Sequence, residues 1–238
     1  MSKLLDKFRG KNDSLNKLRS AIEKTQKKGF DKDDEGYWKP TLDKTKSCSA
    51  IVRLLPVPEG ESFTQVHKHS FKGPTGTWYI ERSRTTLGEL DPVGELNSRC
   101  WDVEALKDAA RARARRTTYT VNVLVVSDPA VPDNEGKVFL YRMPKSLFAM
   151  VDELANPTEE GDDAIDPFHP FDGANFRIRG AGSKNGPNYA KSKFEKQSPL
   201  CGGDEDKIEA VLAQVKDTQI ELDPKLYKSY EDLKAKLD

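Results

Sequence analysis

Four arginines lie within a short stretch near the middle of the chain, at Arg111, Arg113, Arg115 and Arg116, and Tyr119 follows them directly. An arginine side chain stays charged and donates to phosphate through a planar fork of N–H groups. An aromatic ring offers a flat face on which a nucleobase can stack. Basic side chains beside aromatic rings are therefore the pattern that a single-stranded nucleic acid requires, because its phosphates are charged and its bases are exposed.

Two further tyrosines could extend such a surface. Tyr141 lies on the strand that we expect to pair with the strand of Tyr119, and Tyr189 lies in a basic loop close to Lys191. A single tyrosine in a strand is more often a core or sheet-surface residue, and a run of arginines is more often a solvated helix face. Both ordinary alternatives therefore remain open on the residues alone.

The composition limits the class of protein. Charged residues make up 33% of the 238 residues and hydrophobic residues 36%, with a formal net charge of zero. The charge is uneven, because residues 1–30 are rich in lysine and arginine whereas residues 204–238 are rich in aspartate and glutamate. The sequence has three scattered cysteines, no continuous apolar run at its start and no stretch long enough to span a bilayer. We therefore expect a protein of a reducing, intracellular compartment that does not enter a membrane.

The pattern of apolar and turn residues predicts an α+β fold. Expected helices cover residues 13–28, 101–113 and a short stretch after Pro144. Two more are expected near the C-terminus, the first capped by Asp204 or Asp206 and the second by Asp223. Residues 83–100 are expected to be irregular. Expected strands cover residues 49–55, 77–82, 117–126, 137–143 and 176–179, with the third and fourth pairing in antiparallel fashion.

Several segments of the sequence resemble one family. They are GFDKDDEGYWKPTLDKTKSCSAIVRLL at 29–55, HSFKGPTGTWYIE at 69–81, the stretch 116–142, FDGANFRIR at 171–179, NYAKSKF at 188–194 and the terminal YKSYEDLKAKL. In this order they resemble the single-stranded-DNA-binding (helix-destabilising) proteins of T-even-type bacteriophages. The stretch from Asn122 to Arg142 is the most specific part of the resemblance.

The resemblance implies a fold and a function. It implies a β-barrel of the oligonucleotide-binding type with a small lobe inserted at about residues 60–100, flanked by N- and C-terminal helices. It assigns residues 1–28 to a basic arm for self-association along DNA and 29–238 to the DNA-binding core, with C-terminal helices in 204–238. It implies cooperative, sequence-nonspecific coating of single strands in phage replication, recombination and repair, with replication and recombination proteins as partners, in the cytoplasm of an infected bacterium.

The resemblance also suggests roles for single residues. Arg115 and Arg116 match the basic pair before the DNA groove, and Tyr119, Tyr141 and Tyr189 match its base-stacking rings. Together with the flanking basic residues, the predicted DNA-binding set is Arg111, Arg113, Arg115, Arg116, Tyr119, Tyr141, Tyr189 and Lys191.

The metal site of the family is not conserved in this sequence. The family has a zinc-binding lobe with one histidine and three cysteines. His69 matches the histidine, but the cysteine positions fall at about Ser83, Val93 and Leu96. We therefore expect no metal and no cofactor, although His67, His69 and Cys100 could form an improvised site. Without zinc, a small apolar core could hold the lobe together, formed by Trp78, Leu87, Leu90, Val93, Leu96 and Trp101.

Two other classes of protein remain as alternatives. A metal-dependent nuclease or another DNA-processing enzyme needs paired carboxylates. Asp162-Asp163 and Asp204-Glu205-Asp206 are carboxylate clusters, but they lie in a loop and at a helix cap without matching partners. No phosphate-binding loop, nucleophile elbow or HExxH motif is found, so we expect no catalytic residue. The second alternative is a structural phage protein that binds no nucleic acid.

Overall fold

The computed structural model describes residues 36–158, 163–183 and 186–237. The chain divides into two compact units, residues 1–37 and 38–238. The expected basic arm at 1–28 and its helix lie outside the described residues. Within the described ranges, no helix has the length and apolar character that crossing a bilayer demands.

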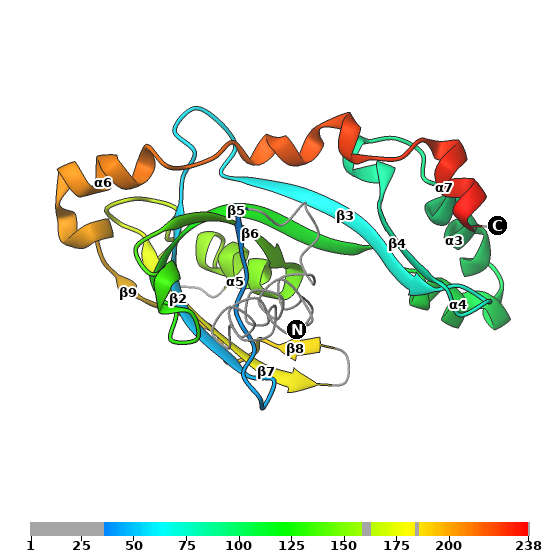
Figure 1. The fold of residues 1–238 in the computed structure, drawn as a ribbon, viewed down its shortest axis with the longest axis horizontal. Helices are drawn as coiled ribbons and strands as arrows, with labels where there is room; N and C mark the ends of the chain where they lie inside the picture. Colours follow the sequence, from blue (N-terminus) through cyan, green and yellow to red (C-terminus); the bar gives the residue numbers. More distant parts are fainter. Residues whose placement is uncertain (1–35, 159–162, 184–185, 238) are drawn as a thin grey trace, which may run out of the picture. The chain divides into compact units, whose positions relative to one another are not determined.

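The second unit is an α+β structure built on one sheet (Figure 1). The expected strands are present as β2 (Cys48–Leu55), β4 (Trp78–Arg82), β5 (Arg116–Ser127), β6 (Val138–Pro144) and β7 (Ala174–Ser183). The predicted antiparallel pairing of β5 with β6 is confirmed, with Val121 opposite Tyr141. Shorter strands β1 (Tyr37–Trp38), β8 (Gly186–Asn188) and β9 (Lys193–Gln197) complete the sheet together with β3 (Phe63–Lys72).

The expected closed barrel is not formed by the described strands. The path runs β1-β6-β5-β2-β7-β8 without returning to its start, and β3, β4 and β9 lie off this path. The reason is that two different strands, β3 and β2, pair with successive parts of the same edge of β5. Its first half, up to Val121, pairs with β3, and its second half, from Asn122, pairs with β2. Because β2 and β3 diverge from this point, the sheet branches and stays open.

Strand β3 is missing from the sequence prediction. Its buried positions are Thr64, Val66, His69 and Phe71, so the inward alternation shifts by one residue after Val66 and includes two polar residues. Thr64 is satisfied by a hydrogen bond with Thr218, at 2.9 Å between the two hydroxyl oxygens. Such satisfied polar residues hide the two-residue hydrophobic period on which strand prediction depends.

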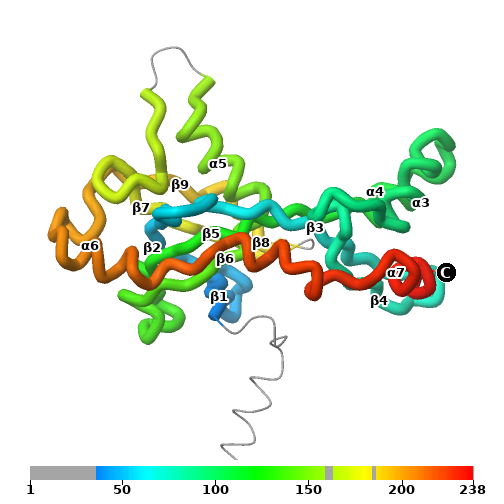
Figure 2. The backbone as a smooth tube through the Cα atoms, turned by 90° about the horizontal axis from the view of Figure 1, so that it is seen from above, coloured from blue at the N-terminus to red at the C-terminus, as the bar shows by residue number. Residues whose placement is uncertain are grey.

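Three apolar clusters hold the unit together. The main one lies between the sheet and helix α5 (Lys145–Ala155), which begins after Pro144 as expected. The second lies beneath helix α6 (Glu205–Leu212). Of the two predicted caps of this helix, Asp204 is the one formed, because it accepts a hydrogen bond from Lys207 N. The third lies in the lobe beneath helix α7 (Tyr230–Leu237). Figure 2 shows the C-terminal segment running from α6 to α7 along the sheet.

The lobe differs from its sequence prediction in two respects. Residues 83–100 contain the short η3 turn (Arg84–Leu87) and helix α3 (Pro92–Trp101), and the helix expected at 101–113 is reduced to the η4 turn (Glu104–Leu106) and α4 (Lys107–Ala112). The overlooked signal is Asp91-Pro92, because Asp91 caps α3 by accepting from Val93 N and Gly94 N.

The expected apolar core of the lobe is also wrong, except for Val93. Trp78, Leu90 and Trp101 are 51%, 70% and 42% exposed. The buried cluster consists instead of Phe71, Tyr79, Val93 and Leu233. Leu233 belongs to the C-terminal helix α7, so residues far apart in the sequence supply the core that the lobe's own exposed residues do not.

Candidate nucleic-acid interface

The paired strands β3 and β5 have one covered face and one open face. On the covered face, the Thr120 hydroxyl donates a hydrogen bond to the carboxylate of Glu221. Glu221 is fully buried and belongs to the η7 turn (Thr218–Leu222) of the C-terminal segment. Because side chains alternate along a strand, Thr117 and Tyr119 point to the other face. The β3 residues directly opposite them are His67 and Gln65. The open face therefore carries a tyrosine, a histidine and polar side chains.

An aromatic ledge lies at one end of this open face. We define it as Phe63, Tyr119 and Phe148. The rings of Tyr119 and Phe148 are stacked, with centroids 3.7 Å apart and planes 5° apart, and Phe63 lies 4.8 Å from Phe148. Gln65 fixes the tyrosine by donating to its hydroxyl oxygen at 3.1 Å. Phe63 is 38% exposed, so the ledge reaches the surface with rings whose positions are held by neighbours.

Sequence reasoning predicted only Tyr119 of these three rings. Phe63 and Phe148 come from β3 and α5, which are distant from β5 in the sequence. A usable signal was the two-residue spacing of Phe63, Gln65 and His67, which places them on one face of a strand. The position of Phe148 depends on how α5 packs, and no local pattern indicates it.

The basic segment, residues 111–116, leads from the lobe into β5, and its four arginines have different surroundings. Arg111 and Arg116 are exposed. Arg113 is half-buried, donating to Asn97 Oδ1 at 3.0 Å and to Cys100 Sγ at 3.2 Å. Arg115 is exposed and donates to Thr85 Oγ1 at 3.0 Å. Arg113 therefore anchors the segment to helix α3, whereas Arg111, Arg115 and Arg116 can meet a ligand.

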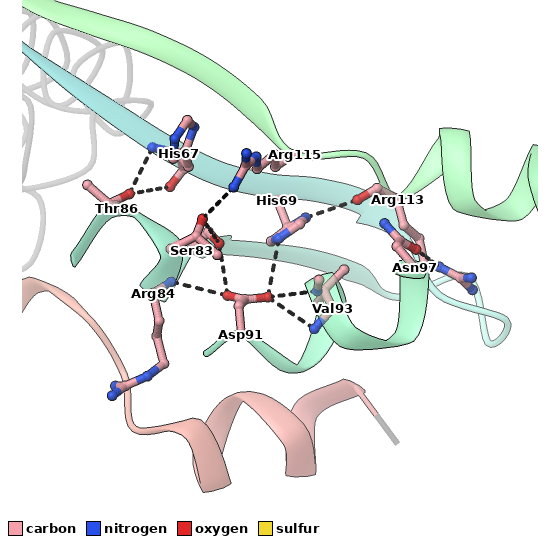
Figure 3. A network of polar contacts seen from close by, with 12 residues as sticks. His67, His69, Ser83, Arg84, Thr86, Asp91, Val93, Asn97, Arg113 and Arg115 are labelled. Carbon is pink, nitrogen blue, oxygen red and sulfur yellow. Dashed lines mark hydrogen bonds and ion pairs between the residues drawn. The ribbon is translucent and has the colours of Figure 1, made fainter. Parts of the chain in front are cut away.

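A buried polar network fixes the backbone of this segment (Figure 3). His69 donates from Nδ1 to the carbonyl oxygen of Arg113 at 2.9 Å, and its Nε2 lies 3.3 Å from Asp91 Oδ1. Asp91 also accepts from Ser83 Oγ at 3.0 Å and from Arg84 N at 3.1 Å. Burial acts to raise the pKa of Asp91, but the contacts with His69, Gly94 N and Ser83 outweigh it and hold that pKa at about 2.

His67 lies between the aromatic ledge and the basic segment. Its Nδ1 is 3.1 Å from Thr117 Oγ1, and its backbone N–H donates to Thr86 Oγ1 at 2.9 Å. Burial, together with the nearby positive charge of Arg115, lowers the pKa of His67. A neutral imidazole is thus favoured on the open face at neutral pH, so the positive charge there belongs to the arginines.

The remaining predicted residues lie elsewhere. Tyr141 is 2% exposed and packs edge-on against Trp38 in the main core, with ring centroids 5.0 Å apart, so its ring has no surface face for a base. Tyr189 is half-buried against the same core, where burial and the nearby Cys48 raise its pKa to about 12. Lys191 is exposed and lines a separate pocket of about 330 Å³ with Arg179. The structure therefore does not place these three residues with the ledge.

The residues matched to a zinc site do not fit a zinc ion. Val93 and Leu96 have no donor atom, and Val93 is fully buried in the lobe core. His69 and Ser83 meet Asp91 instead of a metal. Within residues 36–158, 163–183 and 186–237, no group of three or more His, Cys, Asp or Glu side chains could hold a metal ion. The improvised site from His67, His69 and Cys100 is thus not assembled in the part that the structure describes.

Taken together, the fold and the open face define an α+β domain with an open sheet that presents stacked rings beside exposed arginines. A family model described as gp32 DNA binding protein like matches residues 46–238. A single-stranded DNA-binding protein of Enterobacteria phage T4 is 34% identical over 215 residues, covering 88% of this chain and 71% of that protein. Its counterpart in Enterobacteria phage T2 is 34% identical over 216 residues, with the same coverage. The chain belongs to the gp32 DNA-binding-protein-like family, which confirms the resemblance.

Proposed function

We propose that this protein binds single-stranded DNA without sequence preference. The observation that carries the proposal is the continuity of the aromatic ledge with the basic segment along β5. Tyr119 lies only three residues beyond Arg116 in one strand. Bases stack on rings with little regard to their identity, and phosphates meet arginines in any sequence. The family's relatives, which are named single-stranded DNA-binding proteins, support the same function.

A single strand suits this surface better than a duplex. In a duplex the bases are stacked on each other and paired, so their faces cannot reach Phe63 or Tyr119. The open sheet offers the kind of platform that oligonucleotide-binding folds use, and we propose that the domain is of this type. Phosphates would follow Arg115 and Arg116 while neighbouring bases lie on the ledge.

Replacing Tyr119 by alanine tests the ledge. Each stacked base contributes ~1–3 kcal/mol, so Tyr119→Ala should weaken binding to oligo(dT) by about that amount and leave the salt dependence unchanged. Fluorescence titrations with poly(dT) and with duplex DNA at two salt concentrations measure both quantities. Tyr119→Phe is the matched control, because it retains the ring and should retain most of the affinity. Equal affinity of the wild type for duplex and single strands would contradict the proposed function.

Replacing Arg116 by alanine tests the phosphate contacts. Each phosphate contact contributes about 0.7 to the slope of log K against log salt for single strands. Arg116→Ala should therefore lower the magnitude of that slope by ~0.7. Lys137→Ala is the control, since this exposed lysine follows the turn at the opposite end of β5. A slope that falls equally in both variants would mean that general charge, and not this segment, governs binding.

Binding along a strand is proposed to be cooperative through the basic arm at residues 1–28. Residues 1–30 contain nine lysines and arginines and three acidic residues. This excess of positive charge favours contact with an acidic surface of a neighbouring copy. Deleting residues 1–20 should reduce cooperativity on poly(dT) about tenfold or more, while affinity for an oligonucleotide that holds a single copy stays the same. If affinity for that short oligonucleotide falls just as much, the arm is part of the DNA surface instead.

The proposed setting is the cytoplasm of an infected bacterial cell. There the protein would coat single strands during phage DNA replication, recombination and repair, and would meet replication and recombination proteins. The relatives of phages T4 and T2 support this setting.

A metal-dependent nuclease, the alternative from the sequence, has no support. The relatives are named for binding, and the described part of the chain holds no metal-ligand group. We further propose that the lobe folds without zinc, because Asp91 joins His69, Ser83 and the start of α3 where the family has metal ligands. Metal analysis of the purified protein tests this, and one zinc per chain would overturn it.

A further inference from the structure

A pocket of about 520 Å³ opens in the lobe between η3, helix α3 and the start of β5. Leu90 and Trp101 line it, and so does Arg115 of the basic segment. The two apolar side chains are 70% and 42% exposed and take no part in the lobe core. Exposed large apolar groups gathered at a pocket indicate a binding surface, because leaving them in water is unfavourable.

One arginine lies over the Trp101 ring and another lines the pocket. The guanidinium of Arg111 lies 5.8 Å from the centre of the Trp101 ring. Arg115 forms part of the pocket and is held by its bond to Thr85. Both arginines remain exposed. Arg111 pairs with Asp108 at 2.6 Å, but both side chains of that pair are largely in water, so a phosphate can replace this weak surface contact while the pocket receives the attached base.

The carboxylates of the pocket are engaged by the protein itself. Glu89 pairs with Arg84. The Asp91 carboxylate contacts His69 and accepts hydrogen bonds from Ser83 and from backbone N–H groups. Glu95 accepts from the hydroxyl of Tyr230. The acidic groups therefore have partners of their own, and the exposed arginines dominate what an incoming strand meets at this pocket.

From this arrangement we propose that the lobe pocket receives one base of the bound strand, which stacks on Trp101 while Arg111 and Arg115 contact the adjoining phosphates. The inference rests on the proposed function and extends it from β5 into the lobe. Arg115 connects the two parts, because it lines the pocket and lies four residues before Tyr119. One strand could thus occupy the ledge and the pocket together.

Trp78 supplies a matched control for Trp101. It is 51% exposed and has the ammonium of Lys72 over its ring at 5.5 Å, yet it lies in β4 and does not line the pocket. Trp101→Ala should weaken binding to oligo(dT) about tenfold without changing the salt slope, whereas Trp78→Ala should leave affinity within about twofold. Because both side chains are exposed, thermal unfolding should show that both variants stay folded.

Intrinsic fluorescence provides a second readout. The chain has three tryptophans, and Trp38 is buried. Saturating oligo(dT) should quench Trp78→Phe as strongly as the wild type, and most of the quenching should be lost in Trp101→Phe. Unchanged affinity in Trp101→Ala, or quenching that persists in Trp101→Phe, overturns the pocket proposal while leaving the proposed function intact. A wild type that binds no single strand overturns the function itself.

Discussion

Glu221→Ala is expected to lower the free energy of unfolding by about 3 kcal/mol, because it removes the shared partner of two arginines. The Glu221 carboxylate is fully buried and pairs with Arg82, and its Oε1 lies 2.9 Å from Nε of Arg142. Thr120 Oγ1 donates to the same carboxylate oxygen at 3.1 Å. Removing a buried charge leaves the opposite charges uncompensated, which costs more than the pair itself contributes. The expected loss is at the lower end of the usual range, since the arginine side chains are 17% and 25% exposed and can partly rehydrate.

We define the Glu221 network as Glu221, Arg82, Arg142 and Thr120. Chemical denaturation of Glu221→Ala and of Glu89→Ala compares the stability contributed by this network with that of an ordinary surface ion pair. Glu89 also pairs with an arginine, Arg84, but its side chain is 47% exposed. Its removal should therefore cost under about 1 kcal/mol. Similar losses in the two variants would show that the Glu221 network contributes no more than a surface pair.

The Glu221 network also connects three parts of the second unit. Arg82 belongs to β4 in the lobe, Arg142 to β6 in the main sheet, and Glu221 to the C-terminal segment. Weakening it should loosen the C-terminal segment from the covered face of β5, opposite the proposed DNA surface. The network thus supports the strands that carry the ledge without touching it.

Acidification is expected to destabilise the protein by roughly 5 kcal/mol in total, through Asp91 and Glu221. Burial acts to raise the pKa of Glu221, but Arg82 and Arg142 outweigh it and hold that pKa at about 2. The pKa of Asp91 is also about 2. Because both folded-state values lie below the ordinary ones, the stabilisation is complete above the ordinary pKa. It is lost as pH falls from about 5 towards about 2, because over this range the unfolded chain binds more protons than the folded protein does.

Unfolding free energies measured between pH 7 and pH 2 test this sign and size. Asp91→Asn and Glu221→Gln should each be less stable than the wild type at pH 7 and should each lose less stability on acidification. Asp133→Asn, which alters an exposed carboxylate in the turn between β5 and β6, should follow the wild-type curve. A stability that rises towards pH 2, or equal slopes in all four proteins, would contradict the assignment.

Much of the fold could be predicted where local chemistry was unambiguous. The run of β-branched and apolar residues in β5 indicated a strand, and Asp204 indicated the start of α6. Strand β3 was missed because its buried face includes the polar residues His69 and Thr64, whose partners Asp91 and Thr218 are distant in the sequence. That the sheet stays open could not be predicted, because the sharing of β5 between β2 and β3 is a property of the whole sheet.

Some residues of the candidate DNA surface could likewise be predicted from the sequence, and others could not. The sequence by itself indicated the family, the basic segment and Tyr119, because residues that are near neighbours in the chain stay close together wherever that part of the chain lies. Only the tertiary structure decided that Phe63 and Phe148 complete the ledge, that Tyr141 is buried and that Asp91 meets His69 in the lobe. These outcomes depend on which strands pair and which helix covers a face, and such contacts are settled by packing over the whole chain.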